Sequence, residues 1–156
     1  MRKTVGEYIY NKAKTDDKII VIIGDVGYKM FDKFEKEFPD RFYNIGICEQ
    51  TMIGVAAGMA LEGYKPYVYT ITPFLIERPF EQIKLDIDQQ CVNVKLLGYA
   101  EYPMDGITHK EIDAELLMSL FKNIHSYYPK SIDELNNVLD ESYNSLQPAF
   151  IKLTRC

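Results

Sequence analysis

This chain of 156 residues lacks several kinds of segment, and each absence argues against one class of protein. No block of lysine and arginine occurs and the net charge is −5, which argues against nucleic acid as a partner. The longest aliphatic run, IIVII at residues 19–23, is far too short to cross a membrane. The first residues lack the long apolar core of a signal peptide. We therefore expect a soluble cytoplasmic protein that binds neither membrane nor nucleic acid.

Cysteine is also scarce, and its spacing points to no special chemistry. Cys48, Cys91 and Cys156 form no CxxC pair and no cluster with histidine. This spacing predicts neither a zinc site nor a disulfide framework, so free thiols in a reducing compartment are the expectation. We predict no metal ligand in this chain.

What the sequence does contain is a regular alternation of two apolar patterns. Short β-branched runs, typical of strands, alternate with longer amphipathic stretches, typical of helices. Strands are expected near residues 18–25, 41–47, 65–71, 92–100, 123–128 and 148–155. Helices are expected near residues 4–14, 30–40, 46–63, 78–90, 112–121 and 131–144. The order predicts an α/β fold, a single domain over residues 1–156 with a mainly parallel sheet and helices on both faces.

Helix starts are also marked in the sequence. Thr4 with Glu7, and Ser131 with Glu134, have the spacing of N-terminal capping boxes.

Ligands of parallel α/β sheets bind at the carboxyl ends of the strands. The loops expected there are GDVG at residues 24–27, GICEQ at 46–50, TPFLIERP at 72–79 and EYPMDGITH at 101–109. We expect the functional side chains in these four loops.

The helix expected at residues 46–63, GICEQTMIGVAAGMALEG, is apolar or small for most of its length. Gly54 and Gly58 lie on one face, where another backbone can approach closely. Two interpretations follow: a core helix buried on all sides, or a helix whose small face meets a second protein. Glu49 at its start is either an N-terminal carboxylate favoured by the helix dipole or a catalytic group.

Residues 41–87 carry a more specific pattern. They match R-[FY]-x-[ND]-x-G-I-x-E, a small-residue helix, G-x-[KR]-P-x-V, an aromatic loop and R-x-[FY]-[DE]-Q, and GITH at residues 106–109 resembles the motif G-P-T-H. In this order the motifs resemble the pyrimidine-binding domain of transketolase-like thiamine diphosphate enzymes. The resemblance covers essentially the whole chain and implies the fold of that domain.

The resemblance implies a cofactor role for several residues. Glu49 matches the glutamate that hydrogen-bonds N1′ of the aminopyrimidine of thiamine diphosphate and favours its imino tautomer, while the cofactor acts as electron sink. Ile47 matches a residue near the reactive ring. Phe74 matches the aromatic residue that stacks on the pyrimidine, although a shift of one residue would give Leu75 that position.

Three further residues are assigned with alternatives. His109 matches a histidine that binds substrate oxygens or phosphate, and a structural role competes with this. Arg78 is expected to meet a substrate phosphate or an acidic residue of a partner, unless it is simply solvated. Asp25 either caps the next segment or contacts a cofactor domain. His125 falls within an expected strand and is interpreted as structural.

The chain also departs from the family. Family members hold the diphosphate through Mg²⁺ with a G-D-G segment, which is absent here, and their third domain is absent as well. These departures imply a split enzyme, in which a separate transketolase subunit binds the diphosphate and Mg²⁺. A homodimer or an α₂β₂ assembly is the expected state.

The expected reaction is transfer of a two-carbon ketol unit between sugar or sugar phosphate substrates. One alternative is a subunit that decarboxylates a 2-oxo acid and ligates the fragment to an aldehyde. Another is a non-catalytic interaction module. Cys48 and the stretch YAEYPMD at residues 99–105 differ from the family near the substrate, so donor and acceptor are left open.

Overall fold

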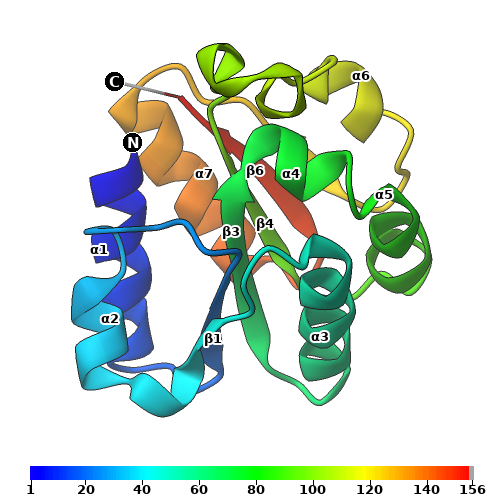
Figure 1. The fold of residues 1–156 in the computed structure, drawn as a ribbon. Coiled ribbons are helices and arrows are strands. Elements are labelled where there is room, and N and C mark those ends of the chain that lie inside the picture. The colour runs from blue at the N-terminus through cyan, green and yellow to red at the C-terminus, as the bar shows by residue number, and fades with distance from the viewer. Residues whose placement is uncertain (155–156) are drawn as a thin grey trace.

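Six short apolar runs form the strands of one sheet in the computed structural model, which describes residues 1–154 (Figure 1). The strands are β1 (Ile19–Ile23), β2 (Phe42–Asn44), β3 (Lys65–Ile71), β4 (Lys95–Tyr99), β5 (His125–Tyr127) and β6 (Ala149–Leu153). Every neighbouring pair is parallel, in the order β2-β1-β3-β4-β6-β5. The predicted parallel α/β sheet is therefore confirmed.

Helices cover both faces of the sheet, as predicted (Figure 1). They are α1 (Arg2–Ala13), α2 (Asp32–Glu37), α3 (Glu49–Leu61), α4 (Thr72–Ile76), α5 (Phe80–Gln82), the π-helix η2 (Ile83–Asp88), α6 (Ala114–Met118) and α7 (Ile132–Asn144). Alternate side chains of each buried strand point to opposite faces. Ile19 and Val21 therefore join the core under α1, α2 and α7, whereas Ile20 and Ile22 join the core under α3, α4 and α6.

The order of the strands in the sheet predicts a crevice beside β1. This strand lies between β2 and β3, so the connections after β1 and β3 leave the sheet in different directions. A ligand can enter where the loops diverge, at the carboxyl ends of these strands. The described residues contain no helix that is long and apolar enough to span a membrane.

The two predicted capping boxes have different outcomes. Helix α1 begins at Arg2, so Thr4 lies inside the helix and its predicted capping role is wrong. The carboxylate of Glu7 instead forms an ion pair with Lys33 of α2. At α7 the cap is confirmed, because the hydroxyl of Ser131 accepts a hydrogen bond from the backbone N–H of Glu134. The Glu134 carboxylate accepts from the backbone N–H of Lys130 and not from that of Ser131.

The segment after β3 differs most from the prediction. Residues 72–79 were expected to form a loop and residues 78–90 one helix, but the chain forms α4, the three-residue α5 and the π-helix η2. Pro73 lies in the first turn of α4, where its missing N–H costs nothing. Pro79 separates α4 from α5, whereas α5 and η2 follow one another without a gap.

Helix α3 is buried on one face only. Met52, Ile53 and Ala56 are fully buried against the sheet. On the opposite face, a side chain built at Gly54 or Gly58 would meet nothing within 4 Å. The small-residue face is therefore exposed on the described chain, and burial on all sides is wrong for this chain taken alone.

A polar cluster lies at the amino ends of the strands, at the end of the sheet opposite the crevice. The ammonium group of Lys95 is buried and donates to the carbonyl oxygens of Ser145, at 3.2 Å, and Gln147, at 2.6 Å. Burial lowers the pKa of Lys95 to about 8, and the positive charge of Lys65 adds to this effect. Charging Lys95 therefore costs folding free energy near neutral pH.

We expect the stability of the protein to rise with pH because of Lys95. Its pKa is about 8 in the folded chain against 10.5 for a free lysine, so the cost of charging it is complete below pH 8 and is relieved towards pH 10.5. Relative to Lys95→Met, the free energy of unfolding of the wild type should rise by roughly 2–3 kcal/mol across this interval. Urea unfolding at both ends of the interval measures the difference. If the difference in free energy of unfolding between the wild type and Lys95→Met does not change with pH, burial of this charge carries no cost. Lys84→Met, at an exposed lysine, is the control.

Candidate functional site

A cavity of about 490 Å³ opens at the carboxyl ends of the strands. Its wall is formed by residues of the predicted loops, by strand ends and by the start of α1: Arg2, Ile23, Asp25, Val26, Gly27, Tyr28, Asn44, Tyr69, Ile71, Phe74, Tyr99, Tyr102, Asp105 and His109. The predicted residues Asp25, Phe74 and His109 thus meet in one cavity, although they are far apart in the sequence. We refer to it as the carboxyl-end cavity.

Asn44 connects two loops of this cavity. Its side-chain oxygen accepts hydrogen bonds from the backbone N–H of Asp25, at 3.1 Å, and of Gly46, at 3.0 Å. Its amide group donates to the carboxylate of Asp25 at 3.3 Å. Asp25 has a positive φ of 55°, a conformation that aspartate tolerates better than most residues. The sequence gives a signal for Asn44, because it is the [ND] position of the motif at residues 41–49.

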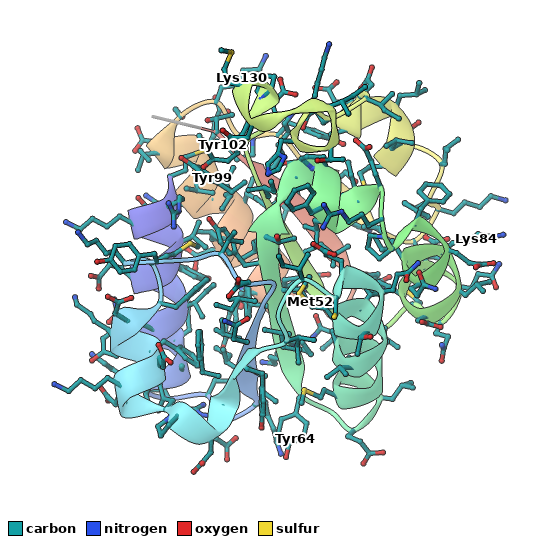
Figure 2. All side chains as sticks on the ribbon, viewed as in Figure 1. Met52, Tyr64, Lys84, Tyr99, Tyr102 and Lys130 are labelled. Carbon is teal, nitrogen blue, oxygen red and sulfur yellow. The ribbon has the colours of Figure 1, made fainter. Side chains whose placement is uncertain are left out.

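Arg2 and a group of tyrosines form another wall, which the sequence reasoning missed. The guanidinium carbon of Arg2 lies 5.0 Å from the ring centre of Tyr99 and 5.9 Å from that of Tyr69. Figure 2 shows Tyr99 and Tyr102 close together near the start of α1, and their ring centres are 6.2 Å apart. Burial raises the pKa of Tyr69 further above its usual value, and its protonated phenol is able to donate a hydrogen bond.

A second cavity, of about 460 Å³, lies at the start of α3. It is lined by Ile47, Cys48, Glu49, Gln50, Thr51 and Arg78, and we refer to it as the Glu49 cavity. Glu49 is 4% exposed and Ile47 is 68% exposed, so a buried carboxylate lies beside open apolar surface. Gly46, with a φ of 78°, makes the turn that brings the two residues to the cavity.

The buried carboxylate of Glu49 has a partner within the chain. Arg78 Nη1 donates to Glu49 Oε1 at 2.8 Å, and the guanidinium carbon lies 3.5 Å from the centre of the Phe74 ring. The Phe74 ring in turn packs edge-on against His109, with ring centres 4.8 Å apart. Four of the six predicted site residues therefore form one continuous row from Glu49 to His109. The pairing of Arg78 with Glu49 was not foreseen.

Phe74 and Leu75 face opposite directions at the start of α4. Leu75 is fully buried in the core under α3 and α4, whereas Phe74 is half-buried and faces the cavity. A ligand in the cavity can therefore contact Phe74 but not Leu75. This placement supports the choice of Phe74 as the stacking residue.

The remaining sequence-level candidates lie as follows. His125 is exposed at the start of β5 and lines neither cavity. Cys48 and Cys91 are free thiols, and Cys156 lies outside the described residues. Within residues 1–154, no group of three or more histidine, cysteine, aspartate or glutamate side chains is placed to hold a metal ion.

The chain is similar to a known family over its whole length. A family model described as the transketolase pyrimidine-binding domain matches residues 1–156. An apulose-4-phosphate transketolase subunit of Actinobacillus succinogenes is 38% identical over 140 residues, which are 88% of this chain and 45% of that protein. The 1-deoxy-D-xylulose-5-phosphate synthase of Clostridium perfringens is 37% identical over 156 residues, which are 97% of this chain and 25% of that protein. The chain thus spans less than half the length of these relatives.

Solved structures agree with this family. A split gene transketolase, described as an inactive beta4 tetramer, superposes with a TM-score of 0.87 at 28% identity and covers 99% of this chain and 51% of that chain. A transketolase from Campylobacter jejuni gives a TM-score of 0.84 at 19% identity, over 99% of this chain and 25% of that chain. The second match shows similarity of fold alone.

The geometry predicts that Asn44 holds the loop that leads to Glu49. In Asn44→Ala the backbone N–H groups of Asp25 and Gly46 lose their acceptor. Protection of these two amides against hydrogen exchange should fall by about two- to tenfold, the size of one hydrogen bond. Asn44→Asp keeps an acceptor oxygen and should retain protection at Gly46. Unchanged exchange in Asn44→Ala would show that the loop is held by other contacts.

Proposed function

Because the chain belongs to the transketolase pyrimidine-binding domain family, we propose that it is the pyrimidine-binding part of an enzyme that transfers a two-carbon ketol unit between sugars. Family membership implies the use of thiamine diphosphate, whose thiazolium ring, when bound, stabilises the carbanion of the transferred unit. The observation that carries the proposal is the row of Glu49, Phe74 and His109 at the carboxyl edge of the sheet. It joins a buried carboxylate to an aromatic ring and an imidazole.

Glu49 and Ile47 of the Glu49 cavity, together with Phe74 of the carboxyl-end cavity, fit an aminopyrimidine. Glu49 is a buried carboxyl group at the start of α3 that can share a proton with a ring nitrogen. Phe74 offers an aromatic face, and a flat group already lies on that face at 3.5 Å. Ile47 offers exposed apolar surface beside them. Glu49 would hold and move the proton at N1′, while Phe74 and Ile47 orient the ring.

The carboxyl-end cavity is the proposed place of the sugar substrate. His109 and Asn44 offer an imidazole and an amide as hydrogen-bonding groups, and Asp25 and Asp105 offer carboxylate acceptors. These are the groups that bind hydroxyls of a sugar. The Tyr69 phenol adds a hydrogen-bond donor. His109 is proposed to bind the substrate oxygens nearest the reacting carbon, because its ring contacts Phe74.

The diphosphate end of the cofactor is assigned to a separate subunit, together with Mg²⁺. The Glu49 cavity has one basic side chain, Arg78, and that side chain is paired with Glu49. Such a lining fits a pyrimidine but not a diphosphate–metal group. Two relatives, one described as a transketolase subunit and the other as a split gene transketolase, support the same division, and an α₂β₂ heterotetramer is the proposed assembly. The exposed small-residue face of α3 is the proposed contact surface.

Isothermal titration tests this function. Thiamine diphosphate with Mg²⁺ should bind to the chain mixed with its diphosphate-binding subunit, and not to either chain alone. In the mixture, Glu49→Gln should lower turnover by about 10²–10⁴-fold, because the amide cannot transfer the proton. Glu35→Gln, at an exposed glutamate of α2 that lines neither cavity, removes the same charge and should behave as the wild type.

Two results would overturn the proposal. The first is a mixture that folds and associates yet binds no cofactor, which would leave the interaction module as the explanation. The second is full turnover in Glu49→Gln, which would place the proton transfer elsewhere.

A further inference from the structure

Arg78 occupies the space between two groups of the site. Its Nη1 lies 2.8 Å from Glu49 Oε1, and its guanidinium carbon lies 3.5 Å from the centre of the Phe74 ring. The guanidinium therefore makes one hydrogen bond to the carboxylate and one stacking contact with the ring. Among the described residues, no other side chain forms an ion pair with Glu49 or places a cation over Phe74.

These two contacts are the ones that the proposed function gives to the aminopyrimidine. A guanidinium and an aminopyrimidine are both flat, conjugated groups that can place a face on an aromatic ring. The guanidinium donates a hydrogen bond to the Glu49 carboxylate, whereas N1′ of the aminopyrimidine would share a proton with the same carboxyl group. Stacking at 3.5 Å leaves no room for a second flat group on the same face of Phe74. One group must leave before the other binds.

Arg78 and Phe74 also divide the site. Phe74 lines the carboxyl-end cavity and Arg78 lines the Glu49 cavity, so their stacked side chains form the wall between the two. Solvent can receive the displaced group, because the Arg78 side chain is 35% exposed.

From this geometry we infer that Arg78 is a placeholder for the aminopyrimidine, which must displace it from Glu49 and Phe74. The inference rests on the proposed function and adds that the site holds one flat, nitrogen-containing group at a time between Glu49 and Phe74. The Arg78 contacts keep the buried carboxylate paired until a ligand takes their place, since an unpaired buried charge is costly. Arg78 therefore competes with the cofactor for its site.

Binding of the pyrimidine fragment to Arg78 variants tests the competition. The probe is 4-amino-5-hydroxymethyl-2-methylpyrimidine, titrated into the full chain with its partner subunit. Arg78→Gln should bind it about five- to thirtyfold more tightly than the wild type, because no cation–π contact has to be broken. Arg78→Lys keeps the charge but not the planar face and should lie between the two.

Lys84→Gln is the matched control, because Lys84 lies on the outer side of the same segment and is exposed (Figure 2). It removes one positive charge and should bind the probe as the wild type does. Nuclear magnetic resonance gives a second readout in the wild type. The Nε–Hε signal of Arg78 should lose the ring-current shift caused by Phe74 when the probe is added.

Equal or weaker binding by Arg78→Gln, or an Arg78 signal that does not move when the probe binds, would overturn the placeholder and leave the proposed function standing. It would show that Arg78 holds Glu49 in place instead. If the wild type and every variant bind neither the probe nor thiamine diphosphate with Mg²⁺, the proposed function is overturned, and the inference with it.

Discussion

The ion pair between Glu49 and Arg78 is the contact on which the arrangement of the site depends. A carboxylate that is 4% exposed loses most of its hydration, and this loss costs several kcal/mol unless a partner compensates it. Arg78 provides that partner from a segment 29 residues further along the chain. The start of α3 and the segment after α4 must therefore keep a fixed spacing. The row that continues through Phe74 to His109 follows from this constraint.

The parallel sheet makes that spacing possible. Because all six strands run in the same direction, the loops after β1, β2, β3 and β4 emerge at one edge, where the carboxyl-end cavity is found. Asn44 joins the first two of these loops through hydrogen bonds to Asp25 and Gly46. The backbone of the strands is rigid, and the chemical groups are carried by short loops at its end, an arrangement that suits a site built from distant residues.

Much of the fold followed from local patterns in the sequence. The run IIVII is buried on both faces of β1, and the prediction of β3 agrees with the strand from Lys65 to Ile71. The capping of α7 by Ser131 was also predictable, because the hydroxyl and the N–H that it binds are three residues apart. The short helix α4 and the π-helix η2 were not, because the two prolines of residues 72–79 are typical of a loop and the apolar spacing of residues 78–90 does not distinguish a π-helix from an α-helix.

The site was predictable only in part. Glu49, Phe74 and His109 stand in motifs or in loops at strand ends, and the structure places all three in one row. Their mutual contacts depend on side-chain directions that no spacing reveals. The pairing of Arg78 with Glu49 is of this kind, as is the placement of Arg2 over Tyr99, since both join residues that are distant in the sequence. The spacing of Gly54 and Gly58 indicated a small-residue face on α3, but the composition alone did not show whether that face is exposed or buried.

The most direct test of the account is a crystal structure of the chain assembled with its diphosphate-binding subunit, thiamine diphosphate and Mg²⁺. The account predicts that a carboxylate oxygen of Glu49 lies within hydrogen-bonding distance of N1′, about 2.6–3.2 Å, and that the pyrimidine lies on the face of Phe74. A pyrimidine bound away from Glu49, with the carboxylate still held by Arg78, would contradict it.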